Sequence, residues 1–75
     1  MEKPMDRIII DPEVLSGKPV IKGTRIPIYL IIELLASKMT EKEILLQYPT
    51  LKKEDIKAAL VYASKCLENE EAIVI

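Results

Sequence analysis

The chain has 75 residues and a formal net charge of −1, so it is long enough for one small domain and has no overall excess of positive charge for a nucleic acid. Hydrophobic residues make up 49% of it and aromatic residues only 4%, so aliphatic side chains must form the core. Because it has no histidine and a single cysteine, Cys66, we expect no disulfide within the chain, no metal, no cofactor and a cytoplasmic location.

Residues 7–26 combine two short β-prone runs with turn signals. Arg7–Ile10 is stopped by Asp11 and Pro12, and Val20–Lys22 is closed by Gly23. Both runs are typical of short strands, and the first is too short for a signal peptide or a membrane span. We predict an N-terminal β arm or hairpin that packs on the helices or pairs with another chain, because a two-stranded hairpin alone is marginal in water.

A strongly apolar helix is predicted over residues 27–37. Pro27 suits its first position, where the missing N–H costs no hydrogen bond. Only Glu33 carries a charge in this segment. A helix that is apolar on nearly every face must be buried on nearly every side, so we expect a homodimer or a larger assembly.

A capping-box pattern marks the start of a second helix. Thr40 stands three residues before Glu43, so each side chain is placed to accept a hydrogen bond from the other residue's backbone N–H. The predicted helix covers residues 40–47 and ends where Pro49 disfavours helical geometry at Tyr48.

The third predicted helix runs from residue 51 or 52 to Glu68, with Thr50 as its N-cap and Asn69 at its end. Apolar spacing of three to four predicts its buried stripe: Ile56, Ala59, Leu60, Ala63, Cys66 and Leu67. The turn before it, residues 48–51, is short, and two helices joined in this way have the layout of a helix-turn-helix.

These elements predict a mainly α fold in one domain, residues 1–75. A β arm at residues 7–26 precedes a three-helix core at residues 27–69. A tail at residues 70–75 follows, and its β-prone last three residues suit a terminal strand.

Six cations are candidates for contact with nucleic acid: Lys18, Lys22 and Arg25 in the arm, and Lys52, Lys53 and Lys57 at the start of the third helix. The arm trio stands in a stretch without acids, whereas Glu54 and Asp55 are interleaved with the helix trio. Solvated lysines are the alternative at each lysine, and for Arg25 the alternative is a brace that holds the fold together. The helix trio contains no Arg, Asn or Gln to contact bases in bidentate fashion.

Three motifs carry a resemblance to a known family. They are Gly-Lys-Pro-Val-Ile-Lys-Gly-Thr-Arg-Ile-Pro over residues 17–27, Tyr-Pro-Thr-Leu over residues 48–51, and Glu-Asp-Ile over residues 54–56. With them the chain resembles, over about residues 7–65, the small prokaryotic proteins called domain of unknown function four-thirty-three. The resemblance implies a homeodomain-like three-helix core with a helix-turn-helix. It also implies an antitoxin role beside a PIN-like ribonuclease toxin, with repression of the shared operon.

The chain departs from that family in the turn between the first two helices. The family usually has glycine where this chain has Lys38, and we expect the backbone there to be left-handed. Such a conformation costs a residue other than glycine about 1 kcal/mol.

Two functions stay open at this point. One is a DNA-binding antitoxin whose partners are operator DNA and a PIN-like toxin; the helical layout and the resemblance favour it. The other is a protein-interaction module that binds no DNA, which the net charge favours. We expect no catalysis, because the chain has neither a histidine nor the spacing of a phosphate-binding loop.

Overall fold

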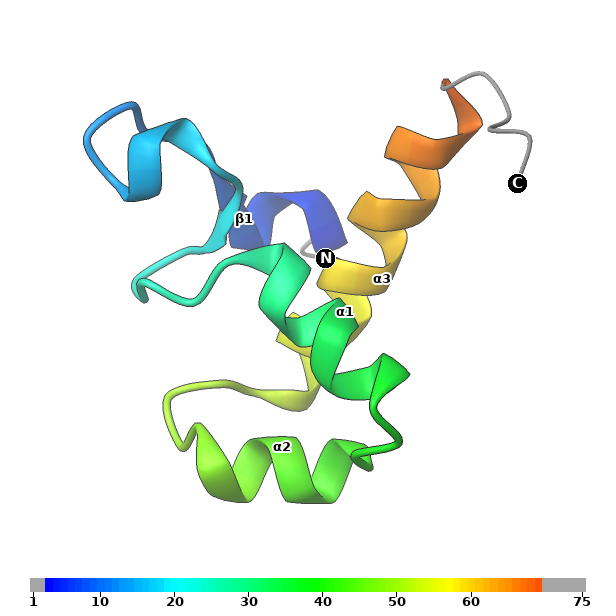
Figure 1. The fold of residues 1–75 in the computed structure, drawn as a ribbon. Coiled ribbons are helices and arrows are strands. Elements are labelled where there is room, and N and C mark those ends of the chain that lie inside the picture. The colour runs from blue at the N-terminus through cyan, green and yellow to red at the C-terminus, as the bar shows by residue number, and fades with distance from the viewer. Residues whose placement is uncertain (1–2, 70–75) are drawn as a thin grey trace.

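The computed structural model describes residues 3–69 and shows three helices preceded by a short hairpin (Figure 1). The N-terminal elements are the 3-10 helix η1 (Pro4–Arg7), β1 (Ile8–Ile9), the 3-10 turn η2 (Leu15–Gly17) and β2 (Val20–Ile21). The helices are α1 (Ile28–Ala36), α2 (Glu41–Gln47) and α3 (Lys53–Glu68). The predicted mainly α fold with an N-terminal hairpin is confirmed, and the predicted tail strand lies outside the described residues.

β1 and β2 form the predicted hairpin, and they pair antiparallel. Their register places Ile8 opposite Ile21 and Ile9 opposite Val20. The first strand is shorter than predicted, because Arg7 belongs to η1 and Ile10 lies beyond the ladder with 60% of its surface exposed. Val20 and Ile21 are fully buried, so the hairpin packs on the helices of its own chain.

The core is built almost entirely from aliphatic side chains, as the composition predicts. Its buried cluster consists of Ile21, Ile28, Ile31, Ile44, Leu51, Ile56 and Ala59. These residues come from the hairpin, all three helices and the turn before α3, so the hairpin and the helices share one interior. No helix within residues 3–69 is long and apolar enough to cross a membrane.

α1 begins one residue later than predicted. Pro27 is not its first helical residue but its N-cap, with extended backbone (φ −75°, ψ 151°), because it forms an isolated bridge with Val20 of the hairpin. Ile28 and Ile31 are buried, whereas Tyr29 is 51% exposed. The expected burial of this helix on nearly every side is therefore not reached within one chain.

The turn from α1 into α2 has the expected left-handed residue. Lys38 has φ 72°, and the N–H of Met39 donates to the carbonyl of Leu34 over 3.1 Å. This closure satisfies a carbonyl at the end of α1. The capping box that follows is also confirmed: Thr40 Oγ1 accepts from the Glu43 N–H at 3.1 Å, and Glu43 Oε1 accepts from the Thr40 N–H at 2.9 Å.

The start of α3 differs from the prediction. Its N-cap residue is Lys52 and not Thr50, and Thr50 lies in the turn that precedes the helix. The backbone N–H of Lys52 is satisfied by the carboxylate of Asp55, one of the buried residues of α3. Asn69 ends the helix as predicted.

The buried face of α3 is also rotated from the predicted stripe. Ile56 and Ala59 are buried as predicted, but Leu60 is 50% exposed, Leu67 is 67% exposed and Cys66 is exposed. The inward residues are Asp55, Ile56, Ala58 and Ala59. The two alanines present little side-chain bulk to η1 and α1, against which α3 packs, whereas the last turns project beyond them (Figure 1).

Candidate nucleic-acid interface

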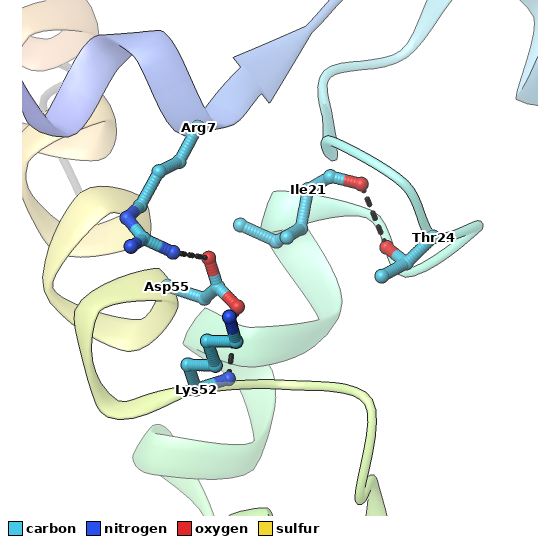
Figure 2. Close-up of polar contacts among 5 residues, drawn as sticks. All are labelled: Arg7, Ile21, Thr24, Lys52 and Asp55. Atoms are coloured by element: carbon cyan, nitrogen blue, oxygen red, sulfur yellow. Dashed lines mark hydrogen bonds and ion pairs between the residues drawn. The ribbon is translucent and has the colours of Figure 1, made fainter. Parts of the chain in front are cut away.

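One buried ion pair fixes the start of α3 (Figure 2). Arg7 Nη1 donates to Asp55 Oδ1 over 2.9 Å, and the other carboxylate oxygen accepts from the N–H of Lys52 over 2.8 Å. The Asp55 side chain is 6% exposed and that of Arg7 24%. A charge-assisted contact of this kind joins two residues 48 positions apart and anchors η1 to α3.

This pair changes the electrostatics expected for the helix trio. The Asp55 carboxylate is buried and its charge is paired with that of Arg7, so it offsets the exposed lysines beside it in the sequence less than an unpaired acid would. Of the two interleaved acids, Glu54 alone remains exposed. Lys52, Lys53 and Lys57 are all exposed at this end of the helix.

Lys53 and Lys57 lie one turn apart and line a shallow hollow of about 360 Å³ between α2 and α3. Glu41 of α2 and Glu54 line the same hollow. Two cations and two anions therefore share this surface. Its charge is mixed, which limits the number of counterions that a phosphate backbone would release there.

Lys22 and Arg25 flank a tightly held turn after β2. Thr24 Oγ1 donates to the Ile21 carbonyl over 2.7 Å, as Figure 2 shows, and accepts from the N–H of Ile26 at 3.0 Å. Gly23 has φ 81°, a conformation that favours glycine. The turn is held by its own hydrogen bonds, and both cations are exposed.

Lys18 lies apart from that turn, with its ammonium 5.1 Å from the centre of the Tyr29 ring on α1. This is a cation–π contact, which fixes the position of the lysine while leaving it exposed. The three arm cations thus occupy two places, one on the turn after β2 and one against α1.

The bracing arginine is Arg7 and not Arg25. Within residues 3–69, no hydrogen bond or ion pair holds the exposed side chain of Arg25. Nothing local in the sequence marks Arg7 for this role. Asp55 carried a weak signal, since an acid three residues after a helix N-cap is placed to accept from the cap's N–H.

The architecture and these surfaces define a small helical domain with an N-terminal β hairpin and with exposed cations around that hairpin and at the start of α3. The chain belongs to the family described as protein of unknown function (DUF433), whose model matches residues 8–63. A crystal structure of a DUF433 member from Anabaena variabilis is similar, with a TM-score of 0.78 and 35% identity over 83% of this chain and 61% of that chain.

Two uncharacterised proteins are also similar in sequence. Protein y4eO of Sinorhizobium fredii is 36% identical over 52 residues, which cover 69% of this chain and 24% of that protein. A protein of Archaeoglobus fulgidus is 62% identical over 24 residues, 32% of this chain and 67% of that protein. The chain therefore spans about a quarter of the length of the first relative.

Proposed function

We propose that this chain is a DNA-binding antitoxin that represses its own operon and neutralises a PIN-like ribonuclease toxin, and that it acts by binding and not by catalysis. The DNA half of the proposal is supported by one observation: all six candidate cations are exposed. The toxin half is supported by the family resemblance of the sequence.

In this proposal α2 and α3 act as a homeodomain-like helix-turn-helix. Pro49, Thr50 and Leu51 separate the cap residues of the two helices, which suits the short turn of that motif. The start of the second helix of such a motif meets the DNA groove, and Lys52, Lys53 and Lys57 lie there. Lysines without a bidentate partner contact phosphates and do not distinguish bases, so we expect weak sequence discrimination from this helix.

The arm cations should contribute at least as much to DNA affinity as the helix cations: Lys18, Lys22 and Arg25 against Lys52, Lys53 and Lys57. Lys53 and Lys57 share their hollow with Glu41 and Glu54, whereas no acid lies between Glu13 and Glu33 in the sequence around the turn. Charges within a Debye length, roughly 8 Å at physiological salt, offset one another.

The test measures binding of the promoter DNA of the chain's own operon by fluorescence anisotropy at several salt concentrations. Three variants each remove one candidate contact: Lys22→Ala, Arg25→Ala and Lys53→Ala. Where the lost contact was made to a phosphate, the slope of log affinity against log salt concentration should become shallower by about 0.9. Lys65→Ala is the matched control, because Lys65 is exposed at the far end of α3 and pairs with Glu68. If Lys53→Ala alone abolishes binding, the turn has no role.

The second candidate function is a protein-interaction module that binds no DNA. The net charge of −1 and the mixed charge of the α2–α3 hollow favour it. If the wild type does not bind the promoter but co-purifies with the product of a neighbouring toxin gene, this second function is correct and repression is not.

A further inference from the structure

An apolar groove of about 420 Å³, which residues 3–69 leave open, runs between α1 and the last turns of α3. α1 contributes Ile28, Tyr29 and Ile32 to its wall, and α3 contributes Tyr62, Cys66 and Leu67. Tyr29 is 51% exposed and Leu67 67% exposed. Burial, followed by a hydrogen bond with Cys66, raises the pKa of Tyr62 above its ordinary value.

The α3 wall of the groove continues the core-facing side of that helix. Asp55, Ala59, Tyr62 and Cys66 follow one another at spacings of four, three and four, so they share one helix face. This face is buried at Asp55 and Ala59, half-buried at Tyr62 and exposed at Cys66. The pattern of a buried stripe thus continues into the last turns of α3, which project beyond η1 (Figure 1) and form one wall of the groove opposite α1. When the core-facing side of a helix continues where the single chain leaves it exposed, that apolar side is typically covered by another surface.

The charges on the groove favour a second copy of the same chain as that surface. Among the described residues that line the groove, only Lys18 and Glu33 are charged. Lys18 lies against Tyr29, and Glu33 lies one turn further along α1. In a two-fold symmetric pair with antiparallel α1 helices, Lys18 of each copy meets Glu33 of the other, while the apolar walls face each other.

We propose that a second copy of this chain occupies the groove and forms a two-fold symmetric dimer there. An apolar groove with one cation and one anion on its rim does not suit a nucleic acid, which would contact a field of one sign. The proposal does not rest on DNA binding or on the toxin, since it requires only the chain itself. It also explains why α1 carries more apolar surface than one chain buries.

The first test uses two exposed leucines. Sedimentation at micromolar concentration should give the wild type twice the chain mass of 8.5 kDa. Leu67→Glu, in the groove, should give a monomer at the same concentration, whereas Leu46→Glu, 74% exposed on α2, is the matched control and should stay dimeric. Circular dichroism confirms that both variants fold. A monomeric wild type, or a dimeric Leu67→Glu variant, overturns the proposal.

The reactivity of Cys66 locates the interface independently. The rate at which a maleimide modifies this thiol should fall several-fold as the wild-type concentration is raised through the association range. In the Leu67→Glu variant the rate should not depend on protein concentration. A dimer in which Cys66 reacts as fast as in the monomer would show that the two copies associate through another surface.

Charge reversal tests the two-fold register. Lys18→Glu and Glu33→Lys alone each place like charges together across the axis, and each should weaken association by up to about fivefold per contact. The double variant Lys18→Glu/Glu33→Lys restores opposite charges and should recover the wild-type dissociation constant. If the double variant loses as much free energy of dimerisation as the two single variants lose together, the antiparallel arrangement of α1 is wrong.

Discussion

The starts of α2 and α3 solve the same problem in two ways. At α2, Thr40 and Glu43 exchange hydrogen bonds within four residues, on an exposed surface. At α3, Asp55 accepts from the N–H of Lys52 but also binds Arg7, which is 48 positions away. One helix start is self-contained, and the other depends on the rest of the fold.

The two helix starts differ in how well they can be predicted from the sequence and in how much they should stabilise the fold. A cap made from neighbouring residues is visible in the sequence, because its donors and acceptors are set by spacing alone. A cap that a distant partner completes is not visible, yet it joins two parts of the chain and carries a buried charge. We therefore expect the start of α3 to be the more sensitive of the two to substitution.

The largest effect should come from Asp55→Ala. It removes the acceptor of the Lys52 N–H and the carboxylate that binds Arg7, so the free energy of unfolding should fall by about 2–4 kcal/mol. Urea denaturation followed by circular dichroism measures this loss. Glu54→Ala is the matched control, because this exposed acid lies in the same helical turn; its effect should stay within about 0.5 kcal/mol. Equal losses in the two variants would show that the buried pair adds nothing.

A smaller loss is expected at the self-contained cap. Thr40→Ala should lower the free energy of unfolding by about 0.5–2 kcal/mol, because the N–H of Glu43 loses its acceptor. Thr50→Ala is the matched control, since Thr50 is exposed in the turn and caps no helix. Thermal melts of the two variants rank them directly. The comparison between the two helix starts fails if Thr40→Ala is as damaging as Asp55→Ala.

The same contrast explains which features the sequence predicted. The hairpin, the three helices and the capping box at Thr40 were predicted because each depends on residue type and spacing within a few positions. The left-handed backbone at Lys38 was expected from the family resemblance and not from local spacing. The inward face of α3 was not, because it is set by the packing of Ala58 and Ala59 against other elements and by the distant Arg7–Asp55 pair.

For the candidate site, too, local features could be predicted from the sequence and features that depend on packing could not. Exposure of the six cations follows from their type, since lysine and arginine are seldom fully buried. Their surroundings do not, because the inward turn of Asp55 and the approach of Glu41 to Lys53 arise only when α2, α3 and η1 pack together. Exposed Cys66 was assigned to the core because its spacing is that of a core residue, and the single chain leaves it uncovered.

A gain of stability is expected from a substitution in the turn between α1 and α2. Lys38→Gly removes the strain of a left-handed residue with a Cβ and should raise the free energy of unfolding by up to about 1 kcal/mol. Ser37→Gly places glycine at a neighbouring position with φ −85°, which needs no left-handed freedom. It should lower stability, because it also removes the hydrogen bond that Ser37 Oγ donates to the Leu34 carbonyl over 2.8 Å. Chemical denaturation of the two variants separates relief of strain from a general effect of glycine. A loss of stability in Lys38→Gly would mean that unfolded-state entropy outweighs the strain.

The smallest effect concerns pH and belongs to the α2 cap alone. Hydrogen bonds from the backbone and then from the side chain of Thr40 hold the pKa of Glu43 below its ordinary value of 4.5. Because the folded-state pKa is depressed, Glu43 stabilises the fold above its unfolded-state pKa, and this contribution disappears as the pH falls through the lower, folded-state value. The stability difference between the wild type and Glu43→Gln should therefore be constant near neutral pH and should narrow below about pH 4.5. Glu41→Gln removes the same charge from the first turn of α2 without breaking a capping hydrogen bond, so it controls for the helix dipole. Stability curves measured from pH 7 to pH 3 test this, and a Glu43→Gln difference that widens on acidification would mean that the carboxylate does not act through the cap.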